Sequence, residues 1–177
     1  MLDRHAPGHP LHLVQRSRIG TLCFRCEEER SDYLTWLQRS ARESGCAVHA
    51  YVLMANHVHL LLTPAVPGGA TRLAGTLASA WRGDGVRALW EPHGIRAVVS
   101  RAYFFAAMRY IESNPVRARL AANPRDYPWS SHRANAFGDE NALVRPHPYY
   151  FGLGRSPAER QSAYRALFCS DAVATRA

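Results

Sequence analysis

The stretch that decides the fold runs from Cys46 to Thr63 and reads CAVHAYVLMANHVHLLLT. Residues 46–54 are rich in Val, Ala and Tyr, and residues 57–63 are again mostly apolar, so both halves are typical of β-strands. Only Ala55-Asn56 lies between them, and such a short connection requires the two strands to run antiparallel. The stretch therefore predicts a β-hairpin within an antiparallel sheet.

The elements on either side of this hairpin predict the rest of the sheet. Residues 11–15 (LHLVQ) have the pattern of a first strand, and residues 95–99 form a short fourth strand. Helices are predicted from Glu27 to Gly45, over residues 70–82, and from Arg101 to about Asn114, with Ser100 as the N-cap of the last. The order β-α-β-β-α-β followed by a helix predicts an α+β fold, a ferredoxin-like antiparallel sheet with helices packed on it.

The chain of 177 residues is long enough for one domain with its own core. We expect residues 1–9 to be a flexible tail and residues 10–122 to be the folded domain. Residues 123–177 then form an irregular C-terminal extension that packs on the domain, with a last short helix over residues 157–168. No run of apolar residues is long enough to cross a membrane, and the N-terminus lacks an apolar signal core. These features predict a cytoplasmic protein with no membrane partner.

The charge of the chain indicates a polyanionic partner. The net charge is +8, and all 22 basic residues are Arg. The guanidinium group binds phosphate oxygens in pairs, which suits nucleic acid. A coding bias toward Arg explains the missing Lys, but it does not explain the excess of positive charge. Four cysteines include the pair Cys23 and Cys26, which lacks the second pair that a structural zinc site needs, so we interpret them as reduced thiols.

The second strand of the hairpin carries His57 and His59. Side chains alternate across a strand, so both imidazoles lie on one face, while Val58, Leu60 and Leu62 lie on the packed face. Two imidazoles on one face can bind a single divalent metal if a third ligand comes from elsewhere. By itself a His-x-His pattern also arises by chance, since the chain has nine histidines.

The helix predicted over residues 101–114 can supply that third ligand. Its spacing places Tyr103, Ala106, Ala107, Tyr110 and Asn114 on one face, opposite an apolar stripe of Phe104, Met108 and Ile111. Tyr110 and Asn114 are one turn apart, so a phenol and a neutral oxygen ligand lie side by side. A core tyrosine and a helix end before Pro115 are the ordinary alternatives for these two residues. Their coincidence with the histidine strand favours a metal-assisted tyrosine nucleophile.

Three segments resemble the REP-associated tyrosine transposases, a branch of the single-tyrosine HUH transposases. The first runs from Ala50 to Pro64 (AYVLMANHVHLLLTP), the second from Met108 to Arg119 (MRYIESNPVRAR), and the third from Asp126 to Ser131 (DYPWSS). Residues 10–16 resemble the first strand of that family, and the similarity extends over residues 10–168. The order and separation of the segments are those of the family.

The resemblance implies an HUH endonuclease core over residues 10–122 and an enzyme that acts on single-stranded DNA beside a hairpin. His57, His59 and Asn114 would bind Mg²⁺ or Mn²⁺. Tyr110 would be the catalytic nucleophile, leaving a 5′-phosphotyrosine link and a free 3′-hydroxyl before the strands are rejoined. Such a transposase is cytoplasmic and associates with the nucleoid when bound to DNA; whether this one is a monomer or a homodimer stays open.

Candidate DNA contacts flank this centre. Arg109, Arg117 and Arg119 are suited to phosphates, although they equally fit a solvated helix face. Trp90 and Tyr127 can stack on bases, although buried packing is the more common use of such residues. Trp129-Ser130-Ser131 is interpreted as a structural brace, since no base has the spacing of a nucleophile elbow.

Two other functions fit parts of the sequence. One is a domesticated hairpin-binding protein without catalysis. The segment over residues 72–95 favours it, because the corresponding segment of the resembled family is usually longer and more basic. The other is a metal phosphoesterase that uses activated water, in which Tyr110 is only structural. The intact set of His57, His59, Tyr110 and Asn114 favours the transesterase.

Overall fold

The predicted hairpin is present in the computed structural model, which describes residues 6–18, 20–81 and 90–169. Strand β2 (Cys46–Leu53) pairs antiparallel with β3 (His57–Pro64). The backbone N–H of Met54 donates to the carbonyl of His57 at 2.8 Å and closes the turn. The connection at Ala55-Asn56 therefore forms the antiparallel hairpin that the sequence predicts.

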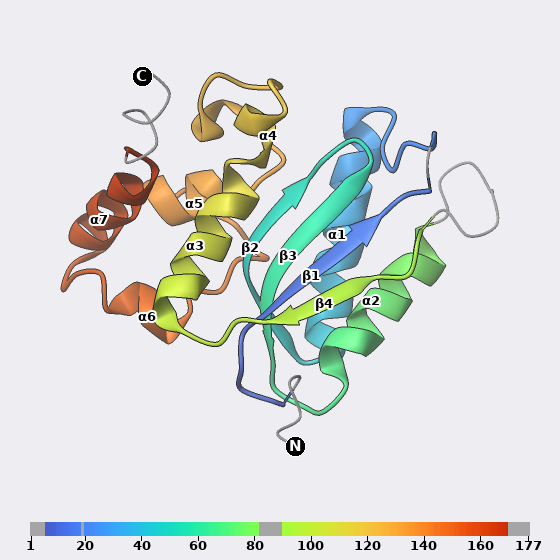
Figure 1. The fold of residues 1–177 in the computed structure, drawn as a ribbon, viewed down its shortest axis with the longest axis horizontal. Helices are drawn as coiled ribbons and strands as arrows, with labels where there is room; N and C mark the ends of the chain where they lie inside the picture. Colours follow the sequence, from blue (N-terminus) through green and yellow to red (C-terminus); the bar gives the residue numbers. More distant parts are fainter. Residues whose placement is uncertain (1–5, 19, 82–89, 170–177) are drawn as a thin grey trace.

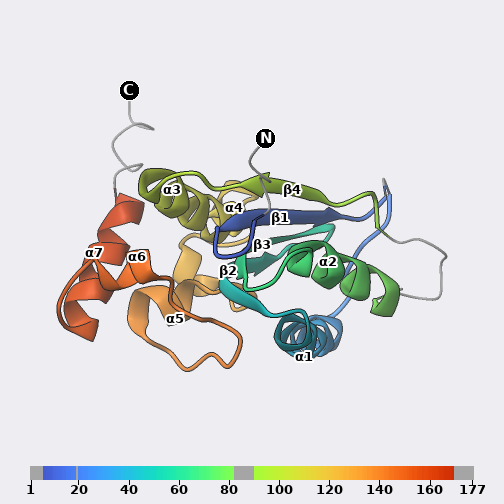
Figure 2. The ribbon, with the colours of Figure 1, turned by 90° about the horizontal axis from the view of Figure 1, so that it is seen from below.

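The sheet has the strand order β2-β3-β1-β4, with every neighbouring pair antiparallel. Strand β1 (Leu11–Arg16) lies between β3 and β4 (Gly94–Ala97). Helix α1 (Glu27–Glu43) connects β1 to β2, and α2 (Gly69–Ala80) connects β3 to β4. Both helices lie against the same face of the sheet (Figure 1, Figure 2). The α+β class and the ferredoxin-like strand order are confirmed.

The face under α1 and α2 holds the first hydrophobic core. It contains alternate residues of the two central strands, Leu11 and Leu13 of β1 with Val58, Leu60 and Leu62 of β3, packed against Tyr33, Leu37, Leu73 and Leu77 of the helices. Because side chains alternate across a strand, the intervening residues His12, Val14, His57 and His59 lie on the opposite face. The sheet therefore separates an apolar core from a face that carries histidines.

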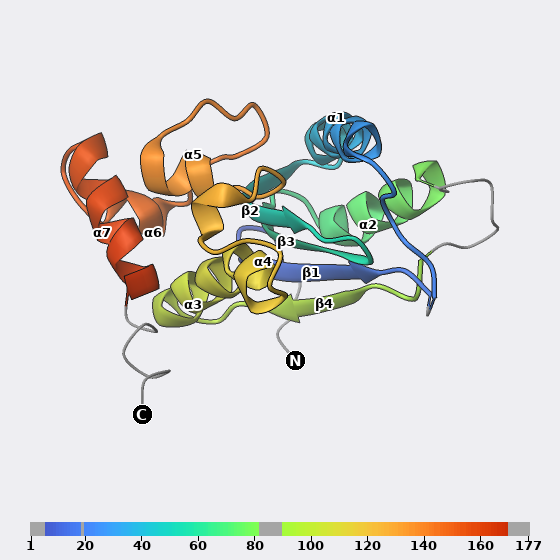
Figure 3. The same ribbon diagram turned by 90° about the horizontal axis from the view of Figure 1, so that it is seen from above.

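Helix α3 (Arg101–Glu112) crosses this second face, on the side of the sheet opposite to α1 and α2 (Figure 3). The hydroxyl of Ser100 accepts a hydrogen bond from the backbone N–H of Tyr103 at 3.1 Å, so the predicted N-cap is confirmed. The apolar stripe of Phe104, Met108 and Ile111 is buried against β2 and β3, as predicted. Helix α3 ends close to the predicted end near Asn114, and α4 (Asn114–Arg117) starts a separate turn with Pro115 in its first positions.

The C-terminal segment contains more regular structure than its composition predicts. The helix α7 (Pro157–Cys169) agrees with the predicted last helix. The segments η1 (Pro124–Asp126), α5 (His132–Phe137) and α6 (Pro148–Phe151) were expected to be irregular. Helices of four to six residues are too short to show a periodic pattern, so tertiary contacts decide them. Within the described residues no helix is both long and apolar enough to span a bilayer.

The C-terminal segment also covers the free edge of β2. The N–H of Leu53 donates to the carbonyl of Trp129, the N–H of Ser131 to Tyr51, and the N–H of Arg145 to Val48, at 2.7–3.0 Å. These bonds satisfy groups that an exposed edge strand would leave open. They support Trp129-Ser130-Ser131 as a structural brace. The proposed boundaries at residues 9 and 122 stay a prediction.

A buried histidine on β2 makes the stability of the fold depend on pH. The ring of His49 is 3% exposed and lies 2.6 Å from the carbonyl of Arg145 and 2.8 Å from the hydroxyl of Thr63. A carbonyl only accepts, so Nδ1 carries the proton and Nε2 accepts from Thr63. Burial lowers the pKa of His49 to about 4. Between about pH 6.5 and pH 4, His49 therefore binds a proton in the unfolded chain but not in the folded protein.

We expect the free energy of unfolding to fall as the pH is lowered through that window. Measured by urea denaturation, the fall should be weaker in His49→Asn by roughly 1.4 kcal/mol per pH unit, the contribution of one proton. Equal pH slopes for the two proteins would contradict this explanation.

Candidate functional site

The two predicted histidines lie next to each other on β3. Their ring centroids are 4.9 Å apart and the ring planes are nearly perpendicular, at 88°. His59 is buried, with 4% of its surface exposed, whereas His57 is half-buried. The predicted face is confirmed, because Val58 and Leu60 point into the first core instead.

Tyr110 and Asn114 approach these histidines from the helical side. The ring of Tyr110 lies edge-on to His59 with centroids 5.5 Å apart, and 41% of its surface is exposed. The side-chain Nδ2 of Asn114 donates to the backbone carbonyl of Tyr110 at 3.3 Å. The Asn114 side chain also forms a hydrogen bond with His57. All four predicted residues are thus brought together, although they come from β3, α3 and α4.

Both histidines are held in the neutral form. Burial lowers the pKa of His59 to about 3, and the neighbouring His12, His57 and Arg16 add to this effect. Burial and Arg16 also lower the pKa of His57, while the hydrogen bond to Asn114 opposes them. A neutral imidazole keeps a lone pair on one ring nitrogen at neutral pH, and this is the form that binds metals.

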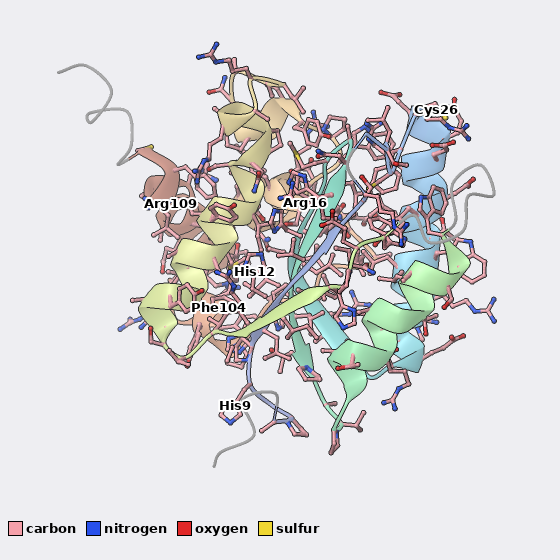
Figure 4. All side chains as sticks on the ribbon, turned by 45° about the vertical axis from the view of Figure 1, so that its right-hand side comes forward. His9, His12, Arg16, Cys26, Phe104 and Arg109 are labelled. Atoms are coloured by element: carbon pink, nitrogen blue, oxygen red, sulfur yellow. The ribbon has the colours of Figure 1, made fainter. Side chains whose placement is uncertain are left out.

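One residue of this cluster is absent from the sequence-based set. His12 of β1 lies between that strand and α3 (Figure 4), with its Nε2 2.9 Å from Nδ1 of His59. Its ring also faces Tyr110, at 6.1 Å between centroids. Burial, and then Arg96, lower the pKa of His12 to about 4. The alternation of Leu11, His12 and Leu13 places His12 on the face away from the first core, which was a signal available in the sequence.

A cleft of about 1280 Å³ opens beside the cluster, between α3 and the β1–β4 side of the sheet. His12, His59 and Tyr110 line it. Its charged lining consists of four arginines and one glutamate: Arg16, Arg96, Arg109, Arg117 and Glu91. The guanidinium of Arg117 lies over the Tyr110 ring, 5.0 Å from its centroid. A phosphate chain in this cleft would meet a positive wall on both sides of the tyrosine.

The residues predicted to contact DNA do not all lie at this cleft. Arg109 and Arg117 line it, whereas Arg119 is exposed to solvent and does not line the cleft. Trp90 is 7% exposed, packs near Tyr33 and donates its indole N–H to the carbonyl of Trp81. It belongs to the first core, so its prediction as a DNA contact is wrong, and burial of its large apolar surface is the reason. Tyr127 is also buried and donates its hydroxyl to the carbonyl of Leu53.

The structure describes residues 72–81 and 90–95 of the segment over residues 72–95. Helix α2 is formed through Ala80, and Glu91 lies at the cleft. Residues 82–89 lie outside the described residues.

The donor set fits a divalent metal. Nδ1 of His57 lies 2.7 Å from the side-chain oxygen of Asn56, and Nδ1 of His59 faces His12. Nδ1 of each imidazole therefore has a partner that can orient the ring, as in metal sites where a partner fixes the ligating imidazole. The Asn114 carboxamide donates an N–H to Tyr110 and hydrogen-bonds to His57, so it is an oxygen-bearing side chain beside the histidine pair. In the described part of the chain no group of three or more His, Cys, Asp or Glu is suited to a metal, and Asn114 stays the predicted third ligand.

Neither a family model nor a curated protein sequence matches this chain. Among solved structures it is similar to a REP-associated tyrosine transposase bound to a REP hairpin, with a TM-score of 0.61. The similarity covers 81% of this chain and 88% of that one, at 16% sequence identity. The two chains share a fold.

Proposed function

We propose that this protein is a metal-dependent transposase that nicks and rejoins single-stranded DNA beside a hairpin through a 5′-phosphotyrosine. The observation that carries the proposal is the meeting of Tyr110 with His57, His59 and Asn114 at the rim of a cleft lined by arginines. The shared fold with a transposase that was solved with a REP hairpin bound supports the same substrate class.

Each residue of the site has a defined task. A divalent ion held by His57, His59 and Asn114 would supply Lewis acidity at the scissile phosphate. The phenol oxygen of Tyr110 forms a bond to phosphorus as the bond from phosphorus to the 3′-oxygen breaks. The phenol proton leaves to water, and the 3′-oxygen takes a proton to become a hydroxyl. Attack of a 3′-hydroxyl on the phosphotyrosine reverses these bonds, so no high-energy cofactor is consumed.

The arginines hold the strand on either side of this exchange. Arg16 lies on the histidine side of the cleft, and Arg109 and Arg117 lie on the tyrosine side. Arg117 also packs over the Tyr110 ring, which restricts the directions that the phenol can adopt. The exposed ring edge is therefore presented toward the cleft in a narrow range of orientations.

The direct test is to incubate the protein with an end-labelled single strand carrying a hairpin, with Mn²⁺ or with EDTA. We expect a protein–DNA adduct that survives denaturation and forms only with metal. Hairpin binding without cleavage at any Mn²⁺ concentration would contradict the proposal and leave a silent binding protein. Cleavage without an adduct would leave a phosphoesterase that uses water.

We expect hairpin binding to weaken steeply as salt is raised, because arginine–phosphate contacts release counterions. Arg117→Gln should reduce the slope of log K against log salt by about 0.7–0.9, the contribution of one phosphate contact. Arg72→Gln removes an equal charge from the exposed surface of α2 and should leave the slope unchanged. Titrations in 50–200 mM salt compare the three proteins. A flat response in the wild type would count against DNA as the ligand.

A further inference from the structure

The side chain that contacts Nδ1 of His59 is itself an imidazole, whereas the side chain that contacts Nδ1 of His57 is an amide. His57 is oriented by a side-chain oxygen of Asn56, which as an acceptor requires the proton of His57 on Nδ1. His59 is oriented by a second imidazole instead, since His12 Nε2 lies 2.9 Å from His59 Nδ1. An imidazole nitrogen can either donate or accept, so this contact has two arrangements.

The register of the sheet brings the two rings together. Val14 of β1 stands directly opposite His59 of β3, and His12 lies two residues earlier on the same face. Diagonal neighbours on one face of an antiparallel pair are within reach of long or aromatic side chains. The contact between His12 and His59 therefore follows from the backbone pairing.

The two arrangements have opposite consequences for His59. If His59 Nδ1–H donates to His12, the lone pair of His59 lies on Nε2, where it can bind a metal. If His12 Nε2–H donates to His59, the neutral His59 carries its proton on Nε2 and has no lone pair there. Only the first arrangement makes His59 a ligand.

We propose that His12 is a positioning residue that accepts the Nδ1 proton of His59 and so presents the Nε2 of His59 as a lone-pair donor. Its connection to metal binding rests on the proposed function, but the direction of the hydrogen bond does not. His12 also faces Tyr110, with the ring planes at 67°. One side chain of β1 therefore lies against both the buried histidine and the tyrosine.

Packing alone would be an alternative role for His12, and two substitutions separate it from hydrogen bonding. His12→Phe keeps an aromatic ring against Tyr110 and removes the acceptor. His12→Gln loses the ring, but its side-chain oxygen can reach the place of Nε2 and accept the proton. His9→Phe, on an exposed residue near the start of β1, is the matched control. Thermal unfolding identifies any variant that fails to fold.

The first measurement is made on the metal-free protein. Long-range ¹H–¹⁵N spectra of the ¹⁵N-labelled full chain near pH 7.5 distinguish the two imidazole tautomers. The His59 signals are assigned by their loss in His59→Ala. We expect His59 to carry its proton on Nδ1 in the wild type and in His12→Gln. A His59 proton on Nε2 in the wild type would overturn the proposal, whether or not the protein acts on DNA.

The second measurement is the affinity for Mn²⁺, followed by calorimetry or by the electron paramagnetic resonance signal of free Mn²⁺. We expect His12→Phe to weaken binding by about 10–100-fold, the usual effect of removing a residue that orients a ligand. His12→Gln should stay within a few-fold of the wild type, and His9→Phe should equal it. Unchanged binding in His12→Phe, or equal losses in His12→Phe and His12→Gln, would overturn the proposal.

The two measurements also separate this inference from the proposed function. If the wild type and His57→Ala bind Mn²⁺ equally poorly, the metal-dependent function fails, and the tautomer spectrum alone decides the role of His12. If the wild type binds Mn²⁺ but forms no DNA adduct, the effect of His12→Phe on Mn²⁺ affinity still decides it.

Discussion

Tyr110→Phe is expected to abolish the covalent DNA adduct and to reduce strand cleavage on the order of 10³-fold or more, as losses of a nucleophile do in other enzymes. The substitution removes only the phenol oxygen. The ring stays against His59 and beneath Arg117, so hairpin affinity should change little. The measurement combines a denaturing gel for the adduct with a binding titration on the same labelled strand.

Tyr103 provides the matched control for this prediction. It lies on the same helix two turns before Tyr110, lines the same cleft and is 39% exposed. Tyr103→Phe should therefore keep cleavage close to that of the wild type. If cleavage survives in Tyr110→Phe, the proposed nucleophile is wrong. If Tyr103→Phe loses cleavage instead, the nucleophile is Tyr103.

Glu112→Ala is expected to destabilise the protein by about 3–5 kcal/mol, the typical cost of breaking a buried charged network. Glu112 is the last residue of α3 and is fully buried. Four donors from the C-terminal segment surround its carboxylate at 2.6–3.0 Å: Ser131, His132, Asn135 and Tyr164. Alanine would leave His132 and Tyr164 without this acceptor and would open a cavity, whereas Ser131 and Asn135 would each keep a backbone carbonyl as a second acceptor.

The thermal midpoint should fall by about 6–20 °C for this loss in a chain of this size. Glu112→Gln keeps one carbonyl oxygen for the donors and should fall between Glu112→Ala and the wild type. Glu43→Ala is the control, because the exposed pair of Glu43 with Arg39 contributes at most about 1 kcal/mol. A midpoint for Glu112→Ala equal to that of Glu43→Ala would mean that the network does not hold α3 to the C-terminal segment.

The Glu112 network also bears on the site. Tyr110 is two residues before Glu112, and Asn114 is two residues after it. Fixing the end of α3 against α5 and α7 therefore determines where the phenol and the carboxamide lie relative to β3. We infer that the C-terminal segment contributes to the site by positioning α3.

Much of the fold follows from local patterns. The short connection at Ala55-Asn56 requires antiparallel pairing, and the strand alternation places His57 and His59 on one face, away from Val58 and Leu60. The helical spacing brings Tyr110 and Asn114 together one turn apart. Each of these inferences concerns residues close in sequence, where backbone geometry leaves few arrangements.

The features that only the tertiary structure shows are contacts between segments far apart in sequence. His12 and His59 are 47 residues apart and meet because β1 inserts between β3 and β4. Trp90, a candidate for stacking on bases, is buried in the first core, where it packs near Tyr33. Glu112 holds the end of α3 in place, but its four hydrogen-bond partners all lie in the C-terminal segment, so the pattern of α3 alone does not indicate this role.

The sequence by itself determined the hairpin, the sheet order that its elements predict, and the four residues of the proposed centre. The tertiary structure decided which side chains support them, namely His12 beside His59 and Glu112 at the end of α3, and which arginines line the cleft. The physical reason is that periodicity reports which face of its own element a residue occupies. The partner on that face depends on strand register and on helix packing, which only the complete set of long-range contacts specifies.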